Sequence, residues 1–188
     1  PLALPASGGP RAYQAICLDI SPEYRSMVQG TFAGLLEVAM RKDNDTGHHI
    51  ERVNRYARDI ASDLHGRPEW PEVNRQFIAC ITQAAALHEA GKIGTPADSL
   101  NKVGTLDPWE WEIMKEHTKN GAYILRTYHI PMAAEIALRH HERWDGTGYP
   151  YGLEGEDIPL AARLFSVVDV WDALCSDRPY RAAMTRDE

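Results

Sequence analysis

The sequence has little of the material that builds membrane-spanning or disulfide-stabilised proteins. No apolar run in its 188 residues approaches the roughly 18 residues of a membrane span. Residues 1–10 also lack the basic-then-apolar layout of a signal peptide. The three cysteines, Cys17, Cys80 and Cys175, are odd in number and have no metal-binding spacing. These absences favour a cytoplasmic protein without disulfides and without a membrane segment.

An excess of positive charge is missing as well. Twenty lysines and arginines face 27 aspartates and glutamates, which gives a net charge of −7. Such a chain repels DNA and RNA overall, so we expect no nucleic-acid partner. A phosphate substrate would therefore need local cations, which bound metal ions could supply.

Helical periodicity is what the sequence does contain. Apolar side chains recur at three- and four-residue spacings, and no convincing alternating strand or internal repeat is present. The predicted helices span residues 24–41, 47–64, 77–89, 109–128, 131–141 and 160–175. The sequence therefore predicts an all-α bundle of about six to seven helices. We expect residues 1–20 to be a linker or upstream segment and residues 21–188 to form one domain.

A long glycine-rich loop, residues 142–159, separates the last two predicted helices. Loops of this length inside a compact helical domain are usually functional. The adjacent histidines His140 and His141 stand directly before it. This placement makes the loop a candidate wall of a functional site.

Histidine and carboxylate side chains gather near the predicted helix ends. The candidate metal ligands are Asp45, His49, His88, Glu89, His117, His140, His141 and Asp169. Asp45 and His49 are four residues apart across a helix start, so both can face one point. Asp169 lies in an otherwise apolar helix, where a carboxylate is costly unless it is paired or bound to metal. Together these residues predict a metal centre.

Two adjacent pairs suggest more than one ion. His88 and Glu89, like His140 and His141, diverge by roughly 100° if helical, which suits ligands to different metals. Mixed histidine and carboxylate ligation fits iron or manganese better than calcium or magnesium. Two ions about 3.5–4 Å apart could share a hydroxide and clamp both oxygens of a phosphoryl displacement. The nearby Lys92 indicates an anionic substrate.

The same residues form a series of short motifs. In order they are Asp43–Val53 with its histidine pair, the His-Glu-Ala-Gly-Lys-Ile-Gly run at 88–94, the lone His117, the double histidine at 140–141, the Gly-Thr-Gly-Tyr-Pro run at 146–150, and Val168–Leu174 followed by Arg178–Arg181. Over residues 43–181 they resemble the HD-GYP family of HD-domain phosphohydrolases.

The resemblance implies hydrolysis of cyclic di-GMP, a bacterial second messenger, to linear pGpG and often onward to GMP. It also implies a two- or three-metal centre, commonly of iron or manganese, with His49 in a ligand position. Lys92 would contact a phosphate or assist the leaving oxygen. Arg178 and Arg181 would hold the phosphates of the dinucleotide, a task suited to the guanidinium fork, and Tyr149 would line the site.

Three departures from the family pattern qualify this expectation. Glu89 stands where the family has aspartate, and one more methylene moves the carboxylate by roughly 1.5 Å in a site that needs about 0.5 Å placement. The charge and the oxygen ligands are kept, so metal binding and a catalytic role of Glu89 are still expected. Asp45 stands where some members use glutamate for a third metal, which favours two ions. The chain ends at Glu188, before the terminal helices expected of the family, so we expect a truncated domain.

Three functional hypotheses follow. The first is a cyclic di-GMP phosphodiesterase. The second is a catalytically impaired module, because of Glu89, that binds cyclic di-GMP or docks a diguanylate cyclase or another signalling protein through the loop at 146–150. The third is a hydrolase of another cyclic dinucleotide. Family members often dimerise, so the resemblance also implies a homodimer.

Overall fold

The computed structural model describes residues 30, 34, 37, 47–84, 87–176 and 183–184, except for the side chains of residues 47, 48 and 83. Within these ranges the chain forms six α-helices and two short 3₁₀ helices. No strand occurs among them, and the only bridge pairs Asp145 with Glu154. This confirms the all-α prediction. None of the helices described is long and apolar enough to cross a membrane.

Several predictions fall outside the described residues. They concern the linker at residues 1–20, nearly all of the helix at 24–41, the ligand Asp45 and the phosphate-binding residues Arg178 and Arg181. These features remain predictions.

Four of the long helices follow their predicted ranges. The bounds are α2 Gly47–Leu64, α5 Pro108–Thr127, α6 Pro131–Arg139 and α7 Leu160–Cys175. Pro108 and Pro131 occupy the first turns of their helices, where the missing N–H would have no helical partner. Asp107 caps α5 by accepting hydrogen bonds from the backbone N–H groups of Trp109 and Glu110. Local capping therefore fixes where these helices begin.

The middle of the chain differs from the prediction. The helix predicted at 77–89 is α3, Arg75–Ala84, and His88 and Glu89 lie in a turn before the 3₁₀ helix η3, Ala90–Gly94. The helix α4, Ala97–Leu100, and the 3₁₀ helix η4, Gly155–Asp157, were not predicted. Both are too short to show a helical period in the sequence.

A close contact of Gly91 with α5 accompanies the turn between α3 and η3. A Cβ atom on Gly91 would lie 1.8 Å from the carbonyl oxygen of His117 and 2.4 Å from the backbone nitrogen of Gly121. Only glycine permits this approach of one backbone to another. The turn that carries His88 and Glu89 is thereby held against α5.

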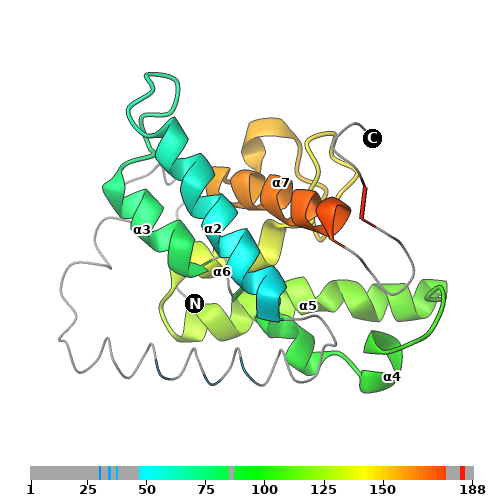
Figure 1. The fold of residues 1–188 in the computed structure, drawn as a ribbon. Helices are drawn as coiled ribbons and strands as arrows, with labels where there is room; N and C mark the ends of the chain where they lie inside the picture. The colour runs from blue at the N-terminus through cyan, green and yellow to red at the C-terminus, as the bar shows by residue number, and fades with distance from the viewer. Residues whose placement is uncertain are drawn as a thin grey trace, which may run out of the picture.

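The helices surround one hydrophobic core. Figure 1 shows α2 between α3 and α7, with α5 along one side of the bundle, and α6 packs on α3, α5 and α7. Val53, Ile81, Leu125, Ile136 and Phe165 are among its fully buried side chains. Phe165 also contacts the rings of two candidate ligands. The core therefore continues directly into the floor of the candidate site.

Candidate metal centre

Seven of the predicted ligands lie together at one end of the core. They are His49 on α2, His88 and Glu89 in the turn before η3, His117 on α5, His140 and His141 after α6, and Asp169 on α7. They form three overlapping groups, and within each group the ligand atoms lie within 4.8 Å of one another. Each group has the residue types and the spacing needed for a divalent metal ion.

The first group joins α2, α7 and the turn before η3. The Nε2 atom of His49 lies 3.6 Å from Oδ1 of Asp169, and Nε2 of His88 lies 4.0 Å from the same oxygen. Both histidines are buried, and Asp169 is partly exposed. The carboxylate predicted to be costly in an apolar helix thus lies between two imidazoles.

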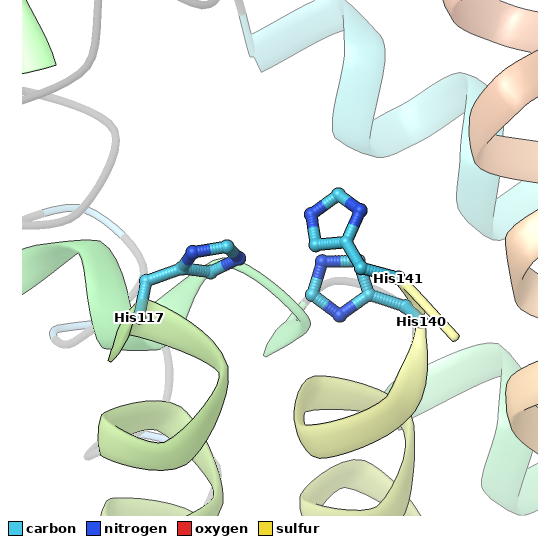
Figure 2. A group of neighbouring side chains, drawn as sticks. All are labelled: His117, His140 and His141. Carbon is cyan, nitrogen blue, oxygen red and sulfur yellow. The ribbon is translucent and has the colours of Figure 1, made fainter. Parts of the chain in front are cut away.

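The second group is built on α5 and the end of α6. Figure 2 shows His117 facing His140 and His141 across a gap. The ring centroid of His117 lies 5.4 Å from that of His140 and 5.2 Å from that of His141. His140 and His141 were predicted to diverge, yet their ring centroids are only 4.0 Å apart. The chain leaves α6 at this point, so the helical angle no longer applies.

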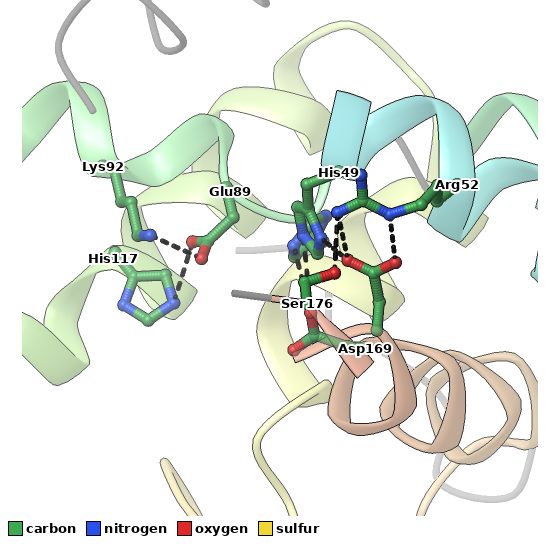
Figure 3. A network of polar contacts seen from close by, with 9 residues as sticks. His49, Arg52, Glu89, Lys92, His117, Asp169 and Ser176 are labelled. Atoms are coloured by element: carbon green, nitrogen blue, oxygen red, sulfur yellow. Dashed lines mark hydrogen bonds and ion pairs between the residues drawn. The ribbon is translucent and has the colours of Figure 1, made fainter. Parts of the chain in front are cut away.

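Glu89 connects the two groups. It forms the third group with His88 of the first and His140 of the second. Its Oε1 atom pairs with Nζ of Lys92 at 2.7 Å, and its Oε2 atom lies 3.4 Å from Nε2 of His117 (Figure 3). Burial raises the pKa of Glu89, but Lys92 and the surrounding histidines outweigh it and hold the pKa well below its usual range. The carboxylate is therefore charged at neutral pH.

Backbone carbonyls orient two of the imidazoles. Nδ1 of His117 donates to the carbonyl of Met114 at 2.6 Å, and Nδ1 of His140 donates to that of Ala137 at 3.0 Å. A carbonyl only accepts, so Nδ1 carries a proton in each ring, and in the neutral form of the ring Nε2 has the lone pair. Both Nε2 atoms are buried without a hydrogen-bond partner among the described residues. Such orphaned lone pairs fit a metal ion, which would satisfy both of them.

The charge state of the histidines suits the same role. Burial, reinforced by the neighbouring imidazoles, lowers the pKa of His141 to about 3 and that of His140 well below its ordinary value. Both rings are therefore neutral at pH 7. Metal ligation requires this deprotonated form.

Two residues that the sequence did not single out support His49. Nδ1 of His49 donates to Oδ2 of Asp172 at 2.7 Å, and Nε of Arg52 donates to Oδ1 of the same carboxylate at 2.6 Å. Burial raises the pKa of Asp172, but hydrogen bonds from Arg52 and His49 lower it overall. Asp172 follows Asp169 by three residues on one face of α7, and that spacing was the available signal.

The glycine-rich loop closes one side of the centre. Tyr149 stacks on His141, with ring centroids 4.7 Å apart and an interplanar angle of 25°. A Cβ atom on Gly148 would lie 2.3 Å from the backbone nitrogen of Arg143, so the loop approaches that backbone closely. The buried carboxylate of Glu142, also missed from the sequence, accepts from the backbone N–H groups of Tyr151 and Leu153 at 2.8 and 3.0 Å. These contacts fix Tyr149 beside the candidate ligands.

Together, the fold and the donor set define a helical domain with a buried centre of histidines and carboxylates. The family model described as HD domain matches residues 37–188, so this chain belongs to the HD-domain family. Its relatives are of HD-GYP type, which confirms the resemblance found in the sequence.

Three relatives define the comparison. A "Cyclic di-GMP phosphodiesterase" of Vibrio cholerae is 40% identical over 163 residues, which are 82% of this chain and 33% of the relative. Another of that name from Thermotoga maritima is 43% identical over 143 residues, 74% of this chain and 37% of the relative. A "3′3′-cGAMP-specific phosphodiesterase 2" of Vibrio cholerae is 39% identical over 174 residues, 91% of this chain and 32% of the relative. The chain thus spans about a third of the length of these relatives.

Proposed function

We propose that this chain hydrolyses cyclic di-GMP to linear pGpG and onward to GMP. The observation that carries the proposal is the pair of buried Nε2 atoms of His117 and His140, which have no hydrogen-bond partner among the described residues and lie beside the charged Glu89. Relatives at about 40% identity carry the name of this activity. A cytoplasmic location accompanies the proposal, because this substrate is a bacterial second messenger.

Two divalent ions, iron or manganese, are the proposed cofactors. Bound by the first and second groups, they would supply Lewis-acid charge and make a water acidic enough to attack a phosphodiester. The group of His88, Glu89 and His140 offers donors for a third ion, with Asp45 as a further candidate ligand. The protein would hold these donors in fixed positions. It would keep the imidazoles neutral and the carboxylates charged.

Lys92 has a proposed role at the substrate. Its ammonium group reaches Glu89 at the edge of the centre. From there it would donate to a non-bridging phosphate oxygen or to the leaving oxygen. Arg178 and Arg181 are proposed to hold the phosphates, and Tyr149 to line the site. The loop at 146–150 is a proposed docking surface for a diguanylate cyclase or another signalling protein, and a homodimer is the proposed assembly.

A second candidate substrate has its own support. Relatives named 3′3′-cGAMP-specific phosphodiesterases are 39%, 34% and 31% identical to this chain. A mixed cyclic dinucleotide presents the same phosphodiester to the centre. Base contacts would then decide the preference.

The test combines metal analysis with product chromatography. The protein is purified with and without oxygen, its metals are measured, and it is incubated with cyclic di-GMP and 3′3′-cGAMP. We expect about two iron or manganese ions per chain and the linear product. His140→Ala should lose both metal and turnover. The matched control is His129→Asn, an exposed histidine with φ of 58°, because asparagine tolerates that backbone conformation.

Each other outcome has a clear meaning. A wild-type protein with neither metal nor linear product would contradict the enzyme hypothesis. Binding of cyclic di-GMP without turnover under any metal would favour the impaired module instead. Turnover of 3′3′-cGAMP alone would favour the second substrate.

A further inference from the structure

The indole of Trp111 borders the centre without belonging to the ligand groups. Its ring centroid lies 5.9 Å from that of Tyr149, edge-on at an interplanar angle of 77°. Tyr149 in turn stacks on the candidate ligand His141. A row of three rings therefore leads from the metal centre to the surface of α5.

The indole of Trp111 is partly open to solvent. It is 45% exposed, although it lies beside a centre whose histidines are mostly buried. The indole and the Tyr149 ring meet nearly at right angles, and the exposed part of the indole offers an apolar surface. A planar aromatic ligand can cover such a surface by stacking.

The same rim also carries positive charge. Lys115 lies one helical turn after Trp111 on α5, and its Nζ atom is 6.0 Å from the centroid of the Tyr149 ring. It pairs with Glu112, whose side chain is mostly exposed. An aromatic surface next to a cation and a phosphate-directed centre matches a nucleotide, in which a sugar joins the base to its phosphate.

We propose that the exposed part of the Trp111 indole, with Tyr149 edge-on beside it, forms a stacking platform for one nucleobase of the cyclic dinucleotide. The inference rests on the proposed function, since the ligand is the substrate assigned there. The platform positions the attached phosphate over the metal centre. Stacking is tolerant of base identity because every base has a flat face. The platform therefore contributes affinity and does not distinguish guanine from adenine.

The experiment compares Trp111→Ala, Trp111→Phe and Trp109→Ala in the metal-loaded protein. We measure metal content, kcat and KM for cyclic di-GMP and 3′3′-cGAMP, and the calorimetric Kd of both. Trp111→Ala should raise KM and Kd roughly tenfold for both nucleotides, with metal content unchanged. Trp111→Phe should restore most of the affinity. Trp109, 71% exposed and about 200° away around the helix, is the matched control and should change nothing.

Unchanged KM and Kd in Trp111→Ala would overturn the platform. So would a loss of metal content, which would mark a structural role, or a loss of affinity for one nucleotide alone. If the wild-type protein binds but does not hydrolyse, the proposed activity fails while the Kd comparison still decides on the platform. A wild-type protein that binds neither nucleotide would overturn the platform together with the activity.

Discussion

Glu89 carries one methylene more than the aspartate that the HD-GYP pattern has at this position. The structure shows how the longer side chain is used: one oxygen pairs with Lys92, and the other points toward His117. The turn before η3, and not a helix, carries the residue. A carboxylate placed by a turn can adjust through backbone rotation more easily than one on a helix.

Exchanging Glu89 tests whether its charge or its length matters. Glu89→Gln keeps the length but removes the charge, so we expect metal affinity to fall by more than the roughly 10- to 100-fold typical of outer partners. Glu89→Asp keeps the charge and should retain the metal. Elemental analysis after dialysis measures both. Full metal content in Glu89→Gln would show that Glu89 is not a ligand.

At the scale of elements, the contact of η3 with α5 positions half of the centre. Gly91 meets the backbone of His117 and Gly121, and Gly121 meets Gly91 in return. The turn with His88 and Glu89 and the helix with His117 are thereby fixed relative to each other. A side chain at residue 91 would push them apart.

Gly91→Ala should therefore damage both stability and metal binding. Overpacking of this kind costs about 1–3 kcal/mol of unfolding free energy, and the distance between Glu89 and His117 would grow. Chemical denaturation and metal analysis measure the two effects. Gly34→Ala is the matched control, because a Cβ atom there meets no atom of the described residues within 4 Å. Equal stability of the two variants would contradict the assigned role of Gly91.

The helices were predictable where local signals mark them. Pro108 and Pro131 mark two starts, and apolar periodicity gives the course of α2 and α7. The turn at 88–89 was not predictable in the same way. It depends on the contact of Gly91 with Gly121, thirty residues further along the chain, and no local pattern encodes such a contact.

At the scale of the whole molecule, the site depends on bringing together ligands from distant parts of the chain. The types of the ligands could be read from the sequence, since a carboxylate such as Asp169 in an apolar helix calls for a partner. Their grouping could not. Which histidine joins which carboxylate follows from the packing of α2, α5, α6 and α7. The contacts of Asp172 with His49 and with Arg52 likewise span 123 and 120 residues.

Metal binding should therefore stabilise the whole domain. Ligands that bind only the folded state add about 2.7 kcal/mol at a hundredfold excess over Kd. With about 2–4 °C per kcal/mol for a chain of this size, chelation should lower Tm by several degrees. Differential scanning calorimetry measures the shift. Glu89→Gln should show a smaller one, and an identical Tm with and without chelator would contradict the prediction.

The first and second ligand groups also differ in how far apart their members lie along the chain. His117, His140 and His141 come from the neighbouring helices α5 and α6 and need only a short stretch of chain. The first group also needs Asp169, and His49 is hydrogen-bonded to Asp172, which lies 123 residues further along the chain. Chains emerge from the ribosome starting at the N-terminus. The histidines of the second group are thus all synthesised before α7, whereas the first group is completed only when α7 is made, and Phe165 of α7 then also packs against the ring of His140.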